Sequence, residues 1–258
     1  MMNSITRFVH SSLTVAEMEA RKIRHDSTEL WTRLVQPALW LLVFGEVFTS
    51  IRGITQGNYT YIQFITPGVL AQSVLFVAIF YGITVVWERD AGLLSKLLST
   101  PSPRSSIIVG KALAAGVRGI FQAIMIFALA LIIGVNLRFD ILDVMGVFIT
   151  IVVFAMCFSA LSMILASFLK TRDRMMGIGQ AITMPLFFAS NAIYPLSLMP
   201  AWLQTVSVFN PLSYGVDAVR SMILTGDYST LPLDALVLGG FTLLFLAIAS
   251  VSIRGMVE

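Results

Sequence analysis

The sequence has few charged residues and almost none of the side chains that usually build reactive centres. Charged residues make up 12% of its 258 residues, about half of their share in soluble domains. The single cysteine, Cys157, lies inside an apolar run and cannot form an internal disulfide. The two histidines, His10 and His25, both lie near the N-terminus, so no metal cluster of the usual spacing can be assembled. These absences exclude a disulfide framework and a metal centre.

Motifs for nucleophilic or phosphate chemistry are also missing. No G-x-S-x-G nucleophile elbow occurs. Gly110 and Lys111 resemble the end of a P-loop, but Ala112 replaces the required Ser or Thr, and Ser105 replaces the first glycine. We therefore expect that the chain is not an enzyme by itself, does not hydrolyse ATP, and binds no metal or cofactor of its own.

What the sequence does contain is long apolar runs. Hydrophobic residues make up 57% of the chain, and the mean hydropathy is +0.87. A predominantly apolar run of about 20 residues is long enough to cross the hydrocarbon core of a bilayer. Six segments qualify: 34–53, 62–87, 107–135, 141–169, 175–194 and 234–253. The expected fold is an all-α membrane protein with six transmembrane helices.

The distribution of Lys and Arg predicts the orientation of these spans. Most of them lie before the first span, after the second span (Arg89, Lys96, Arg104 and Lys111) and after the fourth span (Lys170, Arg172 and Arg174). The opposite connections hold only Arg52, Arg138 and Arg220. Because cytoplasmic connections carry the excess of Lys and Arg, both termini are expected in the cytoplasm of a multi-pass protein of the cell (inner, cytoplasmic) membrane.

The segment before the first span, residues 1–33, has apolar residues at helical spacing and charges on the other face. This pattern predicts an amphipathic helix lying on the cytoplasmic leaflet. It either anchors the chain to the membrane or offers a docking surface to a cytoplasmic partner, and periodicity alone favours the anchor.

The segment at 191–232 is too apolar for a free loop and too rich in proline for one span. Two short helices are expected near 199–208 and 211–223, each starting at or near a proline. Non-helical backbone at membrane depth must be covered by protein or line a cavity. We therefore expect re-entrant or interfacial helices, within 195–225, at the outer end of a pathway.

Two charges fall inside the predicted spans. Glu46 and Arg118 differ in depth by about 13 Å at 1.5 Å rise per residue, which is too far for a salt bridge. Arg118 is expected to extend toward the cytoplasmic interface. Glu46 either lines a cavity near the outer leaflet or bonds a neighbouring helix.

A short charged stretch, "WERDAGLLSKLLSTPSPRSS", joins the second and third predicted spans. Glu88 and Asp90 precede or open a short helix, and the prolines at 101 and 103 end it. Its four leucines, Leu93, Leu94, Leu97 and Leu98, share one face and form an apolar knob. The knob either lies on the membrane surface or fills a socket on a soluble partner.

Three motifs resemble the permease subunits of type-2 ABC exporters, close to the drug-resistance branch. They are "FITPGVL" at 64–70, "WERDAGLLSKLLSTPSPRSSIIVGKAL" at 87–113 and "NPLSYGVDAVR" at 210–220. In that family they correspond to the start of the second span, the coupling helix and an extracellular re-entrant helix. Leu93 departs from the pattern, because many members have a small hydroxyl residue there. The resemblance covers nearly the whole chain.

The resemblance implies a function for each part. Residues 34–258 form the transmembrane domain, which dimerises with a second copy or a paralogous permease. A separate ATPase subunit, which holds ATP and Mg, pushes the coupling helix at 88–100 and the N-terminal helix, and an amphipathic, drug-like or lipid-like substrate leaves the cell. The coupling residues implied are Glu88, Arg89, Asp90, Gly92, Leu93, Leu94, Leu97 and Leu98.

Two further residue sets follow from the resemblance. The substrate pathway is expected at Phe44, Glu46, Gln72, Phe76, Phe187 and Asn191. The outer re-entrant helix is expected to carry Asn210, Pro211, Tyr214, Asp217 and Arg220. A polysaccharide or lipo-oligosaccharide exporter is the alternative within the family, and a stand-alone secondary transporter is the alternative outside it. Partners are the ATPase, a second permease and membrane lipid, with no role for nucleic acid.

Overall fold

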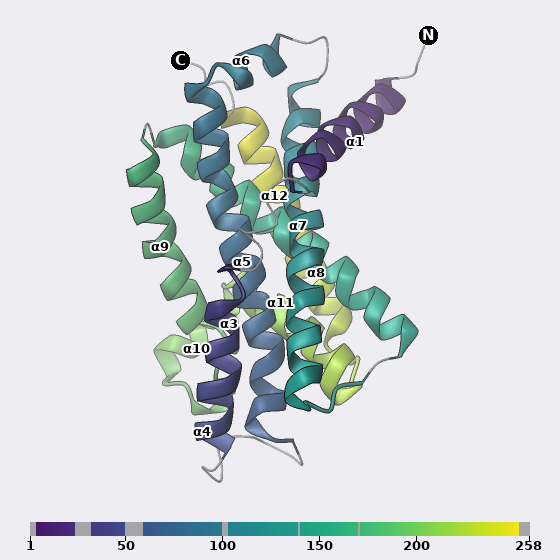
Figure 1. Ribbon diagram of the computed structural model, residues 1–258, viewed down its shortest axis with the longest axis vertical. Helices are drawn as coiled ribbons and strands as arrows, with labels where there is room; N and C mark the ends of the chain where they lie inside the picture. The colour runs from purple at the N-terminus through teal and green to yellow at the C-terminus, as the bar shows by residue number, and fades with distance from the viewer. Residues whose placement is uncertain are drawn as a thin grey trace.

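Helices make up nearly all of the structure, a computed structural model (Figure 1). It describes residues 4–23, 32–49, 59–99, 103–138, 140–169 and 171–252. Within these ranges there is no β-strand. The prediction of an all-α protein is therefore confirmed.

Four helices are long and apolar enough to cross a membrane. They are α5 (Tyr61–Asp90), α7 (Arg104–Ile133), α8 (Ile141–Phe168) and α12 (Leu231–Ser252). They correspond to the second, third, fourth and sixth predicted spans. Of the most apolar part of α5, 78% is buried, against 22% for α12. α5 is therefore the central helix, and α7, α8 and α9 pack around it.

The first and fifth predicted spans form shorter helices. The first is α3 (Val35–Leu39), a π-helical turn η1 (Trp40–Phe44) and α4 (Gly45–Thr49) in succession, and residues 50–53 lie outside the described ranges. The fifth predicted span is α9 (Arg172–Phe188), which has 17 residues and ends six residues before the predicted boundary. α9 stops just after Pro185, whose missing N–H weakens the last turn.

Close helix packing depends on small residues along α5. A Cβ at Gly82 would overlap the hydroxyl oxygen of Ser162 in α8, and that hydroxyl donates to the carbonyl of Ile79. A Cβ at Gly68 would overlap the carbonyl oxygen of Ala192. At these two points the neighbouring segment approaches the backbone of α5 more closely than any residue larger than glycine would allow.

The N-terminal helix α1 (Ser4–Ile23) crosses one end of the bundle and packs against α7. Ser12, Ala16 and Glu19 face inward and are buried, whereas Val9 and Leu13 are exposed. Gly110 of α7 allows the contact, because a Cβ there would lie 2.6 Å from the Ser12 carbonyl oxygen. Part of the predicted segment, residues 24–31, lies outside the described ranges.

The short helix between α5 and α7 is α6 (Leu93–Leu98), and it begins later than the sequence pattern suggests. Glu88, Arg89 and Asp90 do not open it; they form the last turn of α5. Ala91 and Gly92 make the turn between the two helices, and Gly92 has a φ of +69° that glycine adopts without strain. We call the end of the molecule that carries α1 and α6 the α6 end.

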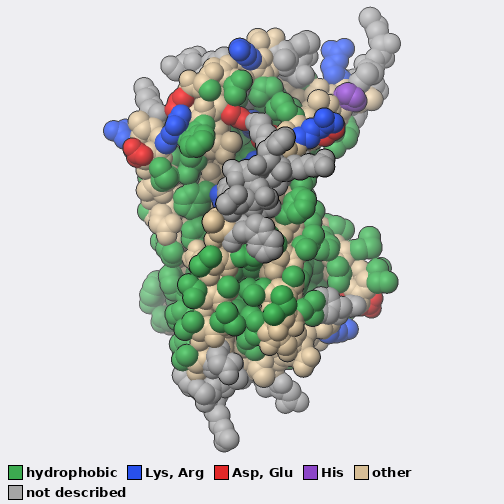
Figure 2. Space-filling model, viewed as in Figure 1, with side chains coloured by type: hydrophobic (Ala, Val, Ile, Leu, Met, Phe, Trp, Pro, Cys, Tyr) green, Lys and Arg blue, Asp and Glu red, His purple; other side chains and the backbone are tan. Residues whose placement is uncertain are grey.

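The opposite end carries η2 (Leu196–Leu198), α10 (Ala201–Val208), α11 (Pro211–Arg220) and a π-helical turn η3 (Ser221–Thr225). We call it the α11 end. Lys, Arg, Asp and Glu gather at the α6 end, above a broad hydrophobic surface (Figure 2). This is the surface expected of a helix bundle surrounded by lipid.

Candidate functional site

A buried lysine joins three helices at the α6 end. Lys111 of α7 is 1% exposed, and its Nζ donates to Glu19 Oε1 of α1 at 3.2 Å. The same Nζ donates to Glu88 Oε2 in the last turn of α5. Both carboxylates are buried. Charges removed from water in this way are stabilised only by partners in good geometry, so the three side chains fix α1, α5 and α7 relative to one another.

Sequence reasoning missed this cluster. It assigned Lys111 to a cytoplasmic connection, and it made no use of Glu19. The sequence did contain one signal, the helical spacing of Lys111. Lys111 lies on the same side of its helix as the apolar residues at 107 and 108, and this side faces α1 and α5. Arg118, two turns further along α7, stacks its guanidinium on the Tyr81 ring at 4.8 Å from the centroid.

The corner between α5 and α6 is also tied to the start of α9. Arg89 Nη1 donates to the carbonyl of Leu169 at 3.2 Å. Arg172 Nε lies 3.6 Å from Asp90 Oδ2, and the Arg172 guanidinium lies 4.7 Å from the centroid of the Trp87 ring. The corner therefore contacts α1 and α7 on one side and the start of α9 on the other.

The leucines of α6 do not form one knob. Leu94 is 1% exposed and packs into a cluster with Val85 and Ile108, whereas Leu93 is 47% exposed. Leu97 is half-buried, and the side chain of Leu98 lies outside the described part of the chain. Leu94 therefore holds α6 on the bundle, and Leu93 is the leucine offered to the surroundings.

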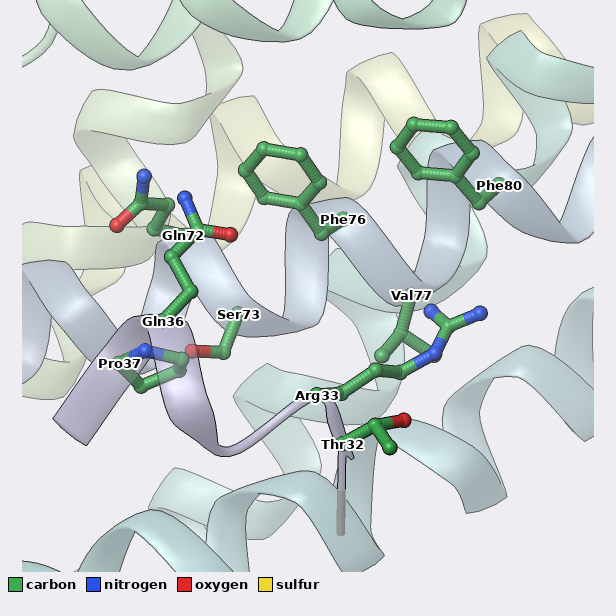
Figure 3. A pocket seen from close by; sticks show the side chains of 9 residues that line it. All are labelled: Thr32, Arg33, Gln36, Pro37, Gln72, Ser73, Phe76, Val77 and Phe80. Carbon is green, nitrogen blue, oxygen red and sulfur yellow. The ribbon is translucent and has the colours of Figure 1, made fainter. Parts of the chain in front are cut away.

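A cavity of about 360 Å³ lies between α5 and the start of the first apolar helix (Figure 3). Two of the predicted pathway residues, Gln72 and Phe76, line it. The Nε2 of Gln72 is buried and has no hydrogen-bond partner among the described residues, and Phe76 stacks on Phe80 with centroids 5.8 Å apart. Its other wall consists of Thr32, Arg33, Gln36 and Pro37.

The other predicted pathway residues lie nearer the α11 end and do not line this cavity. Phe44 is 39% exposed and stacks on Trp40 at 4.4 Å, and Phe187 is fully buried against the same Trp40 at 5.7 Å. Asn191 is buried in the turn that follows α9. The side chain of Glu46 lies outside the described part of the structure.

At the α11 end the "NPLSYGVDAVR" residues form an anchored short helix. Asn210 caps α11 by accepting from the Leu212 amide at 3.0 Å, and Pro211 occupies the first turn. The hydroxyl of Tyr214 donates to the Val208 carbonyl at 2.7 Å, which fastens α10 to α11. Arg220 Nη1 donates to Asp217 Oδ1 at 2.9 Å.

Beyond α11, the chain is fastened to α8 at the same end. The hydroxyl of Tyr228 donates to Asp143 Oδ1 at 2.7 Å, and this hydrogen bond raises the pKa of Tyr228. Among the described residues no group of three or more His, Cys, Asp or Glu side chains is placed to hold a metal ion.

Four helices long and apolar enough to cross a membrane, a cavity lined by polar and aromatic side chains between two helices, and a charged corner at one end define a polytopic membrane protein of the helix-bundle class. The family model for the ABC-2 type transporter matches residues 12–224. The chain belongs to the ABC-2 type transporter family, whose members are transport permeases, the membrane subunits of ABC transporters.

Individual relatives are consistent with this membership. The ycf38 protein of Cyanophora paradoxa, named as a transport permease, is 30% identical over 72% of this chain, and the match spans 65% of that relative's length. The inner membrane transport permease YadH of Escherichia coli is 28% identical over 76% of this chain and 77% of its own. The daunorubicin resistance permease DrrB1 of Streptomyces coeruleorubidus is 23% identical over 83% of this chain and 75% of its own.

Proposed function

We propose that this chain is the membrane subunit of an ATP-driven exporter that moves a drug-like or lipid-like amphipathic molecule out of the cell. A separate ATPase subunit binds ATP and Mg and supplies the energy. The observation that carries the proposal is the α5–α6 corner, which is braced through Lys111 to α1 and through Arg172 to α9. A permease driven from outside the membrane needs a stiff lever of this kind at the end where its ATPase binds.

The exposed parts of the corner are the contact surface for the ATPase in this proposal. Leu93 and Asp90 are exposed beside the turn at Gly92, and α1 presents the exposed Val9 and Leu13 at the same end. Because Glu88 and Leu94 are buried, they act by holding the lever rather than by touching the partner. Closure of the ATPase then moves α1, α5 and α9 together.

The cavity beside Gln72 is the substrate site in this proposal. Its stacked pair, Phe76 and Phe80, suits the apolar part of an amphipathic molecule, and the buried amide of Gln72 has a donor available for a polar group. A volume of about 360 Å³ lies in the range of small-molecule sites. The name of the daunorubicin resistance relative supports a drug-like substrate.

The remaining features of the proposal concern the assembly. The concentration of Lys and Arg at the α6 end supports its placement in the cytoplasm, with both termini inside and α10 and α11 outside. We propose a six-span topology in which the first apolar helix and α9 complete the count. The permease then works as a dimer with a second copy or a paralogous chain in the cytoplasmic membrane.

Affinity purification from the native host tests the ATPase partner. We expect a Walker-A protein to co-purify with the tagged wild-type chain and to be lost with Leu93→Asp, which places a charge at the exposed contact. Leu94→Asp is the matched comparison: because it buries a carboxylate in the bundle, we expect the chain itself to lose its sharp gel-filtration peak.

A well-folded wild-type chain that carries no ATPase would reject the proposal. If Leu93→Asp retains the ATPase, the contact lies elsewhere on the α6 end. ATP-dependent uptake of daunorubicin into inside-out vesicles that hold the purified complex tests the substrate class, and absence of uptake with an active ATPase would reject the drug-like class.

A further inference from the structure

A segment at the end of α9, residues 187–192, packs one helical turn beyond the cavity beside Gln72, toward the α11 end, and we call it the α9 cap. Along α5, Gly68 lies four residues before Gln72 and therefore on the same helix face. The carbonyl of Ala192 rests on Gly68 so closely that a Cβ would overlap it. The α9 cap thus occupies the α5 face one turn beyond the cavity.

The same segment also packs one helical turn beyond the opposite wall of the cavity. Trp40 lies four residues after Gln36, so it is the next residue on that face toward the α11 end. Phe187 packs edge-on against Trp40 with centroids 5.7 Å apart, and it is fully buried. A molecule leaving the cavity along these two helices therefore meets the α9 cap.

One arginine of α11 holds the α9 cap in place. Arg220 Nη2 donates to the Asn191 carbonyl at 2.8 Å, while its Nη1 donates to Asp217 at 2.9 Å. Its guanidinium lies 4.2 Å from the centroid of the Phe64 ring, which belongs to the same α5 face as Gly68. The planar guanidinium thus joins the cap, α11 and α5 at one point.

Weaker bonds hold the segments on either side of Asn191. Asn210 Nδ2 donates to the carbonyls of Leu186 at 2.7 Å and Ala189 at 3.3 Å. The hydroxyl of Tyr61 donates to the Ile193 carbonyl at 3.1 Å. These donors are neutral, and Asn210 also bonds the cap at Ala189, whereas the bond from Arg220 to the cap is charge-assisted, and such bonds are roughly twice as strong.

We propose that Arg220 is a positioning residue for transport: it latches the α9 cap over the cavity, and release of this latch opens the cavity outward. The role in transport rests on the proposed function, whereas the latch itself does not. α9 is fastened at its other end to the α5–α6 corner through Arg172 and Asp90, so movement of that corner pulls on the helix that carries the cap.

A cysteine reporter tests the latch without ATP, substrate or partner. Cys157, the chain's single cysteine, is replaced by alanine, and Ser73→Cys places a nearly isosteric thiol in the cavity wall. A membrane-impermeant maleimide is added to intact cells. We expect Arg220→Gln to raise the labelling rate of this thiol about tenfold or more, because it removes a charged hydrogen bond from the closed state.

Arg138→Gln is the matched control. Arg138 is an exposed arginine at the same end and lies against Gly226, away from the α9 cap, so labelling is expected at the reference rate. Asp217→Asn keeps the bond to Asn191 and is expected to give a smaller increase. The reference protein is the chain with Cys157→Ala and Ser73→Cys alone. Equal labelling rates in this protein and in its Arg220→Gln variant would overturn the latch.

A conservative variant covers the case in which Arg220→Gln does not fold. Arg220→Lys keeps the charge but lacks the second donor arm, so an increase in the same direction is expected. Unchanged labelling in folded Arg220→Lys and Asp217→Asn then overturns the proposal.

In the complex with its ATPase, the variants of Arg220 and Asp217 are expected to transport fewer molecules per ATP hydrolysed. Failure to find an ATPase would reject the proposed function and leave the labelling result standing.

Discussion

Lys111 places a full positive charge in the interior of a helix bundle, where burial alone would be costly. Its Nζ is bonded to Glu19 of α1 and Glu88 of α5, and all three side chains are buried. Loss of one member of such a group leaves an uncompensated charge away from water, which typically costs about 3–5 kcal/mol. The stability of the α6 end therefore depends on this residue.

We expect Lys111→Met to lower the melting temperature of the purified protein strongly, because it removes the cation that is bonded to both buried carboxylates, Glu19 and Glu88. Differential scanning fluorimetry in mild detergent measures the change. A shift of less than a few degrees would show that the cluster contributes little to the fold.

A neutral version of the cluster separates stability from function. The triple variant Glu19→Gln, Glu88→Gln and Lys111→Met removes all three charges of the cluster, so we expect most of the lost stability to return. Under the proposed function, the substrate-stimulated ATPase activity of the complex is expected to stay low, because α1 and α5 are no longer held by ionic bonds. Full recovery of both quantities would assign Lys111 a structural role alone.

At the scale of elements, α5 is fixed to its neighbours at two glycines. At Gly82 it meets α8, and at Gly68 it meets the α9 cap. Both contacts bring backbone or short polar groups together, so a larger residue must push a whole helix aside.

We expect Gly82→Val to destabilise the protein by at least about 1–3 kcal/mol, because its side chain would overlap Ser162 and separate α5 from α8. Gly239→Val is the matched control, since that glycine of α12 has open space where a Cβ would lie. Fluorescence-detected gel filtration after a heating series measures both variants. Equal loss in the two variants would contradict this packing argument.

At the scale of the whole molecule, most charged side chains on the face in Figure 2 lie at the α6 end, and hydrophobic side chains are prominent below them. This polarity supports an orientation with the α6 end in the cytoplasm.

Single-cysteine variants in a Cys157→Ala background test this orientation. We expect Ser99→Cys, near the end of α6, to react with an impermeant maleimide only after the cells are opened, and Ser197→Cys to react in intact cells. The reverse pattern would invert the topology. The native Cys157, which is 0% exposed, is expected to remain unlabelled.

Periodicity and apolar length were sufficient to predict most of the elements. α5, α7, α8 and α12 lie where the apolar runs indicate, because a run of this length has few alternatives to a spanning helix. Asn210 and Pro211 were informative as well, since a cap followed by proline marks a helix start in any context. The boundary between α5 and α6 was placed too early from the sequence; α5 continues to Asp90 and the chain turns at Gly92, while Glu88 is bonded to Lys111, a residue 23 positions away.

By itself, the sequence determined the class of this protein: its apolar runs require helices that satisfy their own backbone hydrogen bonds in lipid, and its Lys and Arg residues indicate a direction across the membrane. Only the tertiary structure decided which residues act together. It buried Lys111 between two carboxylates, turned Leu94 inward and Leu93 outward, and set Arg220 on the Asn191 carbonyl. Such contacts join residues that are distant in the chain, and their partners follow from how the helices pack, which local periodicity does not encode.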